Sequence, residues 1–156
     1  MIRLVCIGKT HYSYIREGVD AFADRIVHYS KFGIVYIPDL KNTRNMDEAT
    51  RRKEEGRLFL PYFQPNTFNI LLDEAGKQMD SAGFARLLEN WTGNSYKGIH
   101  FYIGGPYGFS PDITAKAQFR LSLSGMTFNH ELVRLVFAEQ LYRAFTIINK
   151  EPYHHG

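Results

Sequence analysis

The chain has 156 residues, of which 44% are hydrophobic and 22% are charged, the length and balance of one ordinary globular domain. This composition excludes an intrinsically disordered chain and a collagen-like or coiled-coil repeat. Its apolar runs are far shorter than the ~20 residues that a membrane-spanning helix needs, and the N-terminus lacks a cleavable signal pattern. We therefore expect a single domain over residues 1–156 that works in the cytoplasm, without a membrane partner.

The charge balance and the single cysteine narrow the choice further. Lys and Arg number 19 against 16 acidic residues, which gives a net charge of +3. This charge is compatible with a nucleic-acid partner but does not require one. Because Cys6 is the single cysteine, the chain can form no internal disulfide bond and no zinc-ribbon or thioredoxin-type site. We expect Cys6 to be a small core residue. The many aromatic residues, with ten Tyr and twelve Phe, serve the core and leave some rings for stacking.

In chain order, short β-branched runs alternate with segments of helical periodicity. The first half predicts a strand at residues 2–8, a helix at 13–29, a strand at 33–38, a polar loop at 40–45 and a charged helix at 47–60 that ends before Pro61. In that helix the basic run at residues 51–53 adjoins Glu54 and Glu55, which indicates a face exposed to solvent.

The second half continues the alternation. It predicts a strand at residues 68–73, a helix at 81–91 with Ser81 as its N-cap, and a strand at 98–104. Ser110, Pro111 and Asp112 form a helix-start signal, followed by a strand at 119–124 and a last helix that Asn129 caps and that ends near residue 148. The fold class is therefore α/β, with a mostly parallel sheet and helices on both faces.

Three glycine-bearing loops follow strands of this sheet, at residues 72–77, 104–108 and 123–128. Ligands of open α/β sheets bind outside the carboxyl ends of the strands, and glycine lets the backbone approach a ligand closely. Neither the dinucleotide fingerprint nor the phosphate-binding P-loop spacing is present. The three loops together favour a ligand that is not held by a phosphate cradle.

The histidines are scattered, and none has the spacing of a metal site, so no metal is expected. We interpret His11, His28 and His100 as structural or surface residues. The other three, His130, His154 and His155, flank the last predicted helix.

That last helix carries both an apolar stripe and polar residues. Glu139 and Arg143 are four residues apart and could form a simple ion pair along the helix. Arg143 also neighbours Tyr142 and precedes the tail Tyr153-His154-His155. Such a cationic and aromatic cluster suits a phosphate and a stacked base.

Taken together, these residues resemble the ribosomal RNA large subunit methyltransferase H family, a group of small enzymes in the SPOUT class of knotted methyltransferases. The resemblance covers essentially the whole chain. Its first-half stretches are LVCIGK at residues 4–9 and KEEG at 53–56, followed by Leu72-Asp73 and Gly76-Lys77. The more specific set is YIGGPYG at residues 102–108, LSLS at 121–124, MTF at 126–128, His130, Arg134, EQLYRA at 139–144 and PYH at 152–154.

The resemblance implies a C-terminal trefoil knot and a homodimer with its ligand site at the dimer interface. It implies S-adenosylmethionine as methyl donor and N3 of a pseudouridine in the 23S rRNA of the assembled ribosome as acceptor. Carried over by position, the donor-binding residues are Leu72, Gly104, Gly105, Leu123, Ser124, Gly125, Met126, Thr127 and Phe128.

Methyl transfer to N3 needs alignment, together with removal of the acidic proton or stabilisation of the anion of the base. Arg143 or Arg134 is the hypothesised stabiliser of negative charge on the base, and His130 or His154 the proton acceptor. Tyr153 either stacks on or orients a flipped base, or packs the tail onto the core.

Two positions depart from the family pattern. Asn129 stands where the family often has Pro, and His155-Gly156 ends the tail where a basic residue is usual. The alternatives are a knotted methyltransferase for another rRNA or tRNA site, and a non-catalytic ribosome-binding factor. Without the resemblance, the pattern supports only a small-ligand α/β domain.

Overall fold

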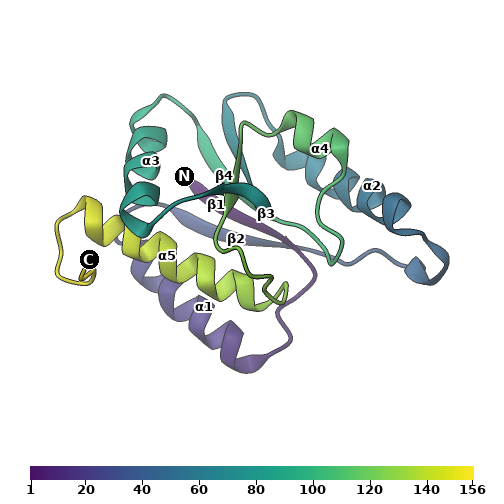
Figure 1. The fold of residues 1–156 in the computed structure, drawn as a ribbon, viewed down its shortest axis with the longest axis horizontal. Helices are drawn as coiled ribbons and strands as arrows, with labels where there is room; N and C mark the ends of the chain where they lie inside the picture. Colours follow the sequence, from purple (N-terminus) through teal and green to yellow (C-terminus); the bar gives the residue numbers. More distant parts are fainter.

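Five parallel strands form one sheet in the order β2-β1-β4-β3-β5, in a computed structural model that describes residues 1–156 (Figure 1). The strands are β1 (Ile2–Ile7), β2 (Phe32–Ile37), β3 (Thr67–Gln78), β4 (Gly98–Ile103) and β5 (Phe119–Ser122). Every residue of the central strand β4 is buried, as expected for a parallel strand covered on both faces. The predicted α/β class with a parallel sheet is confirmed.

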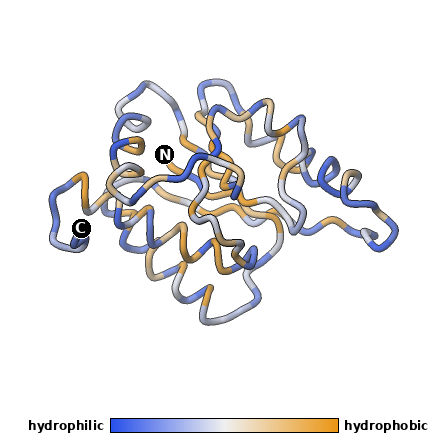
Figure 2. Tube along the Cα trace, in the orientation of Figure 1, coloured by the Kyte–Doolittle hydropathy of each residue, from blue (hydrophilic) through white to orange (hydrophobic).

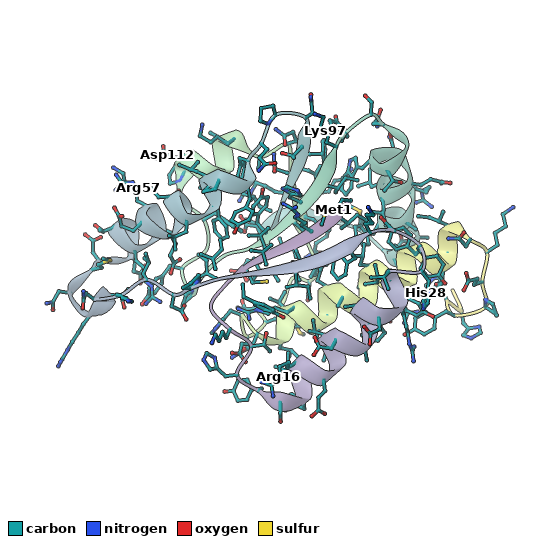
Figure 3. All side chains as sticks on the ribbon, turned by 180° about the vertical axis from the view of Figure 1, so that it is seen from behind. Met1, Arg16, His28, Arg57, Lys97 and Asp112 are labelled. Carbon is teal, nitrogen blue, oxygen red and sulfur yellow. The ribbon has the colours of Figure 1, made fainter.

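Helices cover both faces of this sheet (Figure 1). On one side lie α1 (Ser13–Ile26), α3 (Ser81–Gly93) and α5 (Leu132–Ile148), and on the other lie α2 (Glu48–Phe59) and α4 (Pro111–Lys116). Figure 3 accordingly places Arg57 of α2 and Asp112 of α4 across the sheet from Arg16 of α1. Two short 3-10 turns, Thr43–Asn45 and Leu60–Tyr62, flank α2. No helix is both long and apolar enough to cross a membrane.

Alternation along the strands divides the core into two layers. In β1, Leu4 and Cys6 join the larger core beneath α1, α3 and α5, whereas Val5 and Ile7 join the smaller core beneath α2 and α4. Figure 2 shows the hydrophobic positions gathered along the central strands. Cys6 is fully buried, and burial raises the pKa of its thiol to about 12, so it is the core residue that the sequence predicted.

The segment at residues 72–77 was predicted as a loop, and that prediction was wrong because β3 continues to Gln78. β3 pairs with β5 through Leu72 and again through Lys77, with an irregularity in between. Arg120 of β5 donates to Asp73 at 2.7 Å. A Cβ on Gly76 would lie 2.6–2.8 Å from backbone atoms of Arg120 and Leu121. Glycine here therefore permits a close approach of two strands, not a turn.

Helix starts follow the expected chemistry with small shifts. The N-cap of α3 is Asp80, which accepts from Gly83 N–H at 2.7 Å, and not Ser81, whose hydroxyl donates instead to Gln140. Ser110 caps α4 as predicted. The Asn129 side chain accepts from Glu131 N–H at 2.8 Å, so it stabilises the turn that leads into α5, although the helix itself begins at Leu132.

Two charged side chains at the start of α5 tie this helix to the loop after β1. The buried carboxylate of Glu131 accepts from His11 N–H at 2.8 Å and Tyr12 N–H at 3.1 Å, and bonds His11 Nδ1 at 2.8 Å. Burial alone would raise the pKa of this carboxyl, but these bonds outweigh burial and lower it to about 2. One turn later, Arg134 donates to Thr10 and to the Ile7 carbonyl.

We expect Gly76→Ala to lower the free energy of unfolding by about 1–3 kcal/mol, because the added Cβ meets backbone that cannot rotate away. Chemical denaturation measures this loss. Gly93→Ala is the matched control, since a Cβ at that position would meet nothing within 4 Å, and it should leave stability unchanged or raise it by up to about 1 kcal/mol. Equal effects of the two substitutions would contradict the close approach at Gly76.

We expect Glu131→Gln to lower the free energy of unfolding at pH 7 by about 1–3 kcal/mol, because an ionised acceptor is lost from three bonds. The folded pKa of about 2 lies below the ordinary value of 4.5, so the stabilisation is complete above that value and disappears as pH falls toward 2. Denaturation curves between pH 7 and pH 2 should show the two proteins converging. The exposed Glu17→Gln serves as control, and a difference independent of pH would contradict the assignment.

Candidate active site

A cleft of about 590 Å³ opens where β4 and β5 end, beside Leu72–Glu74 in the middle of β3, and it lies at the edge of the sheet that the sequence predicted for a ligand. Its size is in the range of small-molecule sites. Three stretches contribute most of its wall, and Val133 of α5 completes it. They are Leu72 to Glu74, Ile103 to Phe109, and Leu123 to His130 without Gly125.

The wall after β4 is a tight turn that depends on glycine. Gly108 donates its N–H to the Gly105 carbonyl at 3.1 Å and has a φ of 77°, a left-handed conformation that glycine adopts at little cost. A Cβ on Gly104 would lie 3.1 Å from the Gly108 carbonyl oxygen. Two chain segments thus meet without side chains between them, and the turn presents backbone to the cleft.

The wall after β5 is held by hydroxyl groups. Ser122 donates to the Ser124 carbonyl at 2.9 Å, and Ser124 Oγ accepts from Met126 N–H at 2.9 Å. Thr127 donates to Glu74 at 2.7 Å, which fastens this segment to the middle of β3. Met126 remains 79% exposed, so an apolar side chain stands free at the cleft.

Most of the predicted donor-binding residues lie on this cleft. They are Leu72, Gly104, Gly105, Leu123, Ser124, Met126, Thr127 and Phe128. Gly125 does not line it; a Cβ there would lie 3.1 Å from Gln78 Nε2. Asn129 and Val133 line it without having been predicted as binding residues. Their position beside His130 and the MTF stretch was the available signal.

The charge of the cleft is distinctive. It is lined by two carboxylates, Asp73 and Glu74, by one histidine, His130, and by no lysine or arginine. Asp73 is paired with Arg120, while Glu74 accepts the Thr127 hydroxyl. Such a wall disfavours phosphate groups and favours a neutral or cationic ligand.

The other predicted polar residues gather at the opposite end of α5. Arg143 donates to Glu139 at 3.0 Å through Nε, and its Nη1 lies 3.2 Å from His154 Nδ1. Its guanidinium sits 4.8 Å from the centre of the Tyr153 ring, and Tyr153 donates to Glu139 at 3.1 Å. The bond to Glu139 raises the pKa of Arg143. The helix ion pair and the cationic, aromatic cluster are therefore both present.

One residue of this cluster, His154, lies on a second, smaller hollow of about 450 Å³. His154 and Gln140 line it, together with Leu121–Leu123 and the start of α3. Leu123 is common to both hollows. His130 precedes α5 whereas Arg143, Tyr153 and His154 lie toward or beyond its C-terminal end, and a 17-residue helix is about 25 Å long. One chain does not bring these residues to a single point.

Arg134 lies away from the cleft surface. Its side chain is 1% exposed, donates to Thr10 at 2.9 Å and to the Ile7 carbonyl at 2.8 Å, and lies 5.6 Å from the centre of the Tyr36 ring. It has no carboxylate partner. In this structure it connects α5 to the carboxyl end of β1.

The predicted solvent-exposed charged face of α2 is partly wrong. Glu54 pairs with Arg57 near the surface, but Glu55 is 2% exposed and lies against Gly105 of the cleft turn. Since Gly105 has no side chain, a carboxylate fits where a Cβ would otherwise stand. The sequence alone could not reveal this pairing of two distant segments.

Comparison with known proteins identifies the family. The family model described as predicted SPOUT methyltransferase matches residues 1–154. Proteins called ribosomal RNA large subunit methyltransferase H are similar over 154 residues, 99% of this chain and 98% of each relative. The identity is 48% for the protein of Christiangramia forsetii, 46% for that of Flavobacterium johnsoniae and 38% for that of Porphyromonas gingivalis.

A solved structure supports the fold separately. A probable methylase family protein from Haemophilus influenzae aligns with a TM-score of 0.51 at 11% identity, covering 96% of this chain and 66% of that one. Similarity at this level concerns the fold alone. With a family model over nearly the full length and relatives at 38–48% identity, the chain belongs to the SPOUT methyltransferases, in the group of ribosomal RNA large subunit methyltransferase H proteins.

Proposed function

We propose that this protein transfers a methyl group from S-adenosylmethionine to N3 of a pseudouridine in 23S rRNA of the assembled ribosome. It does so as a cytoplasmic homodimer in which residues 1–156 form one catalytic domain with a C-terminal trefoil knot. The observation that carries the proposal is the cleft itself, glycine-walled and without lysine or arginine, in a chain whose relatives are named large-subunit rRNA methyltransferases.

The residues of the cleft fit this donor. The donor has a cationic sulfonium group and no phosphate, so the carboxylates of Asp73 and Glu74 and the absence of basic residues suit it. Backbone groups of Gly104 and Gly105 hold it, with support from Leu72 and from the segment 123–128, of which Gly125 shapes the backbone without lining the cleft. When bound, S-adenosylmethionine supplies the electrophilic methyl group.

The chain's own polar residues act on the acceptor base. Arg143 stabilises the negative charge that develops on the uracil ring, because its guanidinium is ionised and held by Glu139. Arg134 is buried and bonded within the chain, so we place it in support of the fold. His130, on the cleft wall, and His154, beside Arg143, are the candidate proton acceptors.

Tyr153 orients the acceptor side of the site. Its ring packs edge-on against Tyr142 at 4.8 Å between centres and under the Arg143 guanidinium. Burial, followed by the nearby Glu139 carboxylate, raises the pKa of its phenol, so it remains a neutral donor. Tyr153 can therefore serve both roles. It packs the tail onto α5 and places its ring beside the Arg143 guanidinium, where it can orient the base.

A homodimer resolves the distance between the two groups of residues. If the C-terminal end of one chain lies beside the cleft of the other, Arg143, Tyr153 and His154 of one subunit act with His130 and the donor of its partner. The modest charge of +3 per chain implies weak binding to free RNA. Recognition of the ribosome's shape then supplies specificity.

The two departures from the family pattern affect opposite sides of this site. Asn129 lines the cleft and caps the turn before α5, so it replaces the stiffness of proline with hydrogen bonds. His155-Gly156 lacks the usual terminal cation, and histidine is only partly charged near neutral pH. Contact with RNA phosphates by the tail is correspondingly weaker.

The first experiment is methyl transfer from labelled S-adenosylmethionine to ribosomes lacking the modification, with separate subunits, free rRNA and tRNA in parallel. We expect label only in ribosomes, in a pseudouridine identified by mass spectrometry. Label in tRNA or free rRNA would instead support a knotted methyltransferase for another site. Absence of both label and donor binding in a folded protein would support a non-catalytic ribosome-binding factor.

We expect Arg143→Ala and His154→Ala each to reduce turnover by about 100-fold or more, because a preorganised charge and its partner are lost from the reacting base. Single-turnover assays on ribosomes measure this. Arg86→Ala, an exposed arginine on α3, is the control and should retain activity. Near-normal turnover in both Arg143 and His154 variants would disprove these roles.

Mixed dimers test whether the site is shared between chains. Ser124→Trp blocks the cleft and Arg143→Ala disables the tail, so each homodimer should be inactive. Random mixing should restore about a quarter of wild-type activity, because half of the dimers then contain one intact cleft facing one intact tail. No recovery in mixed dimers would place both functions within a single chain.

A further inference from the structure

One buried carboxylate lies next to the cleft without lining it. Glu55 on α2 is 2% exposed, in a helix whose other acidic residues reach solvent. Its Oε1 accepts from Arg51 Nε at 3.1 Å, and its Oε2 has no hydrogen-bond partner. An ionisable side chain is costly to bury, so its position calls for an explanation beyond the packing of α2.

The Glu55 carboxylate faces the turn at residues 104–108, which forms the wall of the cleft after β4. A Cβ on Gly105 would overlap both carboxylate oxygens of Glu55, so the carboxylate occupies the space that a side chain at residue 105 would need. Burial raises the pKa of Glu55, while the Arg51 guanidinium and the Gly105 backbone N–H act in the opposite direction. The carboxylate therefore packs directly against the backbone of Gly105.

Two further contacts join α2 to the same turn. The Arg51 guanidinium lies 5.5 Å from the centre of the Tyr107 ring, an ordinary cation–π separation. At Gly56 a Cβ would lie 2.8 Å from Ser110 Oγ, so the backbone of α2 is pressed against the residue that begins α4. Gly105, Tyr107 and Ser110 of the segment after β4 are thus supported from behind by α2, on the side of the sheet where Figure 3 places Arg57 and Asp112.

The turn needs this support. Three of its five residues are glycine, the residue that loses most freedom on ordering, and Gly108 N–H to the Gly105 carbonyl is its one internal backbone bond. Its front faces the cleft. The α2 residues packed behind the turn therefore determine the position of its backbone when a ligand binds.

We propose that Glu55 is a positioning residue for the donor-binding turn: its carboxylate, oriented by Arg51, fixes Gly105 from behind and so sets the shape of the cleft wall. The proposal rests on the proposed function, because it takes the cleft ligand to be S-adenosylmethionine. Glu55 touches neither donor nor acceptor and acts through Gly105. Its loss should therefore affect donor binding more than the chemical step.

The test compares Glu55→Gln and Glu55→Ala with Glu54→Gln, the neighbouring surface residue of the same helix. Calorimetric titration measures S-adenosylmethionine affinity, kinetics on ribosomes separate KM from kcat, and hydrogen exchange of the free protein follows the amides of residues 104–109. For Glu55→Gln we expect donor affinity and donor KM to worsen by about tenfold, the scale of one charged hydrogen bond. The kcat at donor saturation and the KM for ribosomes should stay within about twofold of wild type.

Exchange should become faster at residues 104–109 and remain unchanged in β1 and α5. A merely structural role would instead accelerate exchange throughout and lower kcat together with thermal stability, and that result would overturn the proposal. So would wild-type donor affinity in Glu55→Gln. If the wild-type protein itself fails to bind S-adenosylmethionine, the proposed function falls, and exchange at residues 104–109 alone decides the role of Glu55.

A double-mutant cycle supplies an independent readout. Gly105→Ala should weaken donor binding because its methyl group overlaps the Glu55 carboxylate. In Glu55→Ala/Gly105→Ala that overlap is gone, so the double variant should lose less affinity than the product of the two single losses. Strictly multiplicative losses would show that the two residues do not act on one another, and would overturn the proposal.

Discussion

The rest of the structure depends on how the first turn of α5 is fastened to the loop after β1. Glu131 and Arg134 reach across more than a hundred residues of sequence to His11, Tyr12, Thr10 and the carbonyl of Ile7. Because α5 packs against α1 and α3 over the larger core, this fastening sets where the helix lies on the sheet. The segment 123–130, which must reach from β5 to α5, is placed as a consequence, and with it one wall of the cleft.

The two charges achieve this in different ways. Glu131 is an anion whose bonds come mainly from backbone N–H groups, and these bonds favour the ionised form strongly enough to overcome burial. Arg134 is a buried cation without a carboxylate; its two terminal nitrogens donate to a hydroxyl and a carbonyl and its guanidinium faces Tyr36, while its Nε has no hydrogen-bond partner. Guanidinium tolerates such surroundings better than ammonium does, because it is weakly hydrated and offers planar donors. Removing any acceptor from it would leave a buried charge uncompensated, which is more costly than the bond itself.

Sequence patterns predicted the elements whose signals are local. The alternation of strands and helices indicated the parallel sheet, and the general position of ligands in such sheets located the cleft at the carboxyl ends of β4 and β5, beside the middle of β3. Prediction failed at residues whose environment depends on one particular distant partner. Residues 72–77 have the sequence of a loop but form part of a strand because β5 pairs with them. Glu55 has the sequence context of an exposed residue but is buried because Gly105 leaves space for its carboxylate. The separation of His130 from Arg143 could not be predicted either. The resemblance assigns both residues to one site but does not say which subunit of the implied dimer supplies each of them.

The same separation explains the distribution of charge. A cleft for a cationic donor must exclude basic side chains, whereas an acceptor base that becomes anionic needs one close by. Placed in a single pocket, the arginine would oppose the sulfonium group through a low-dielectric wall. Here the acidic and neutral cleft lies at the N-terminal end of α5 and Arg143 in the C-terminal half of that helix, so neither charge weakens the other within one chain. In the proposed dimer the two would meet only on assembly, so the opposing electrostatic demands of donor and acceptor would be met there, with α5 as the spacer within each chain.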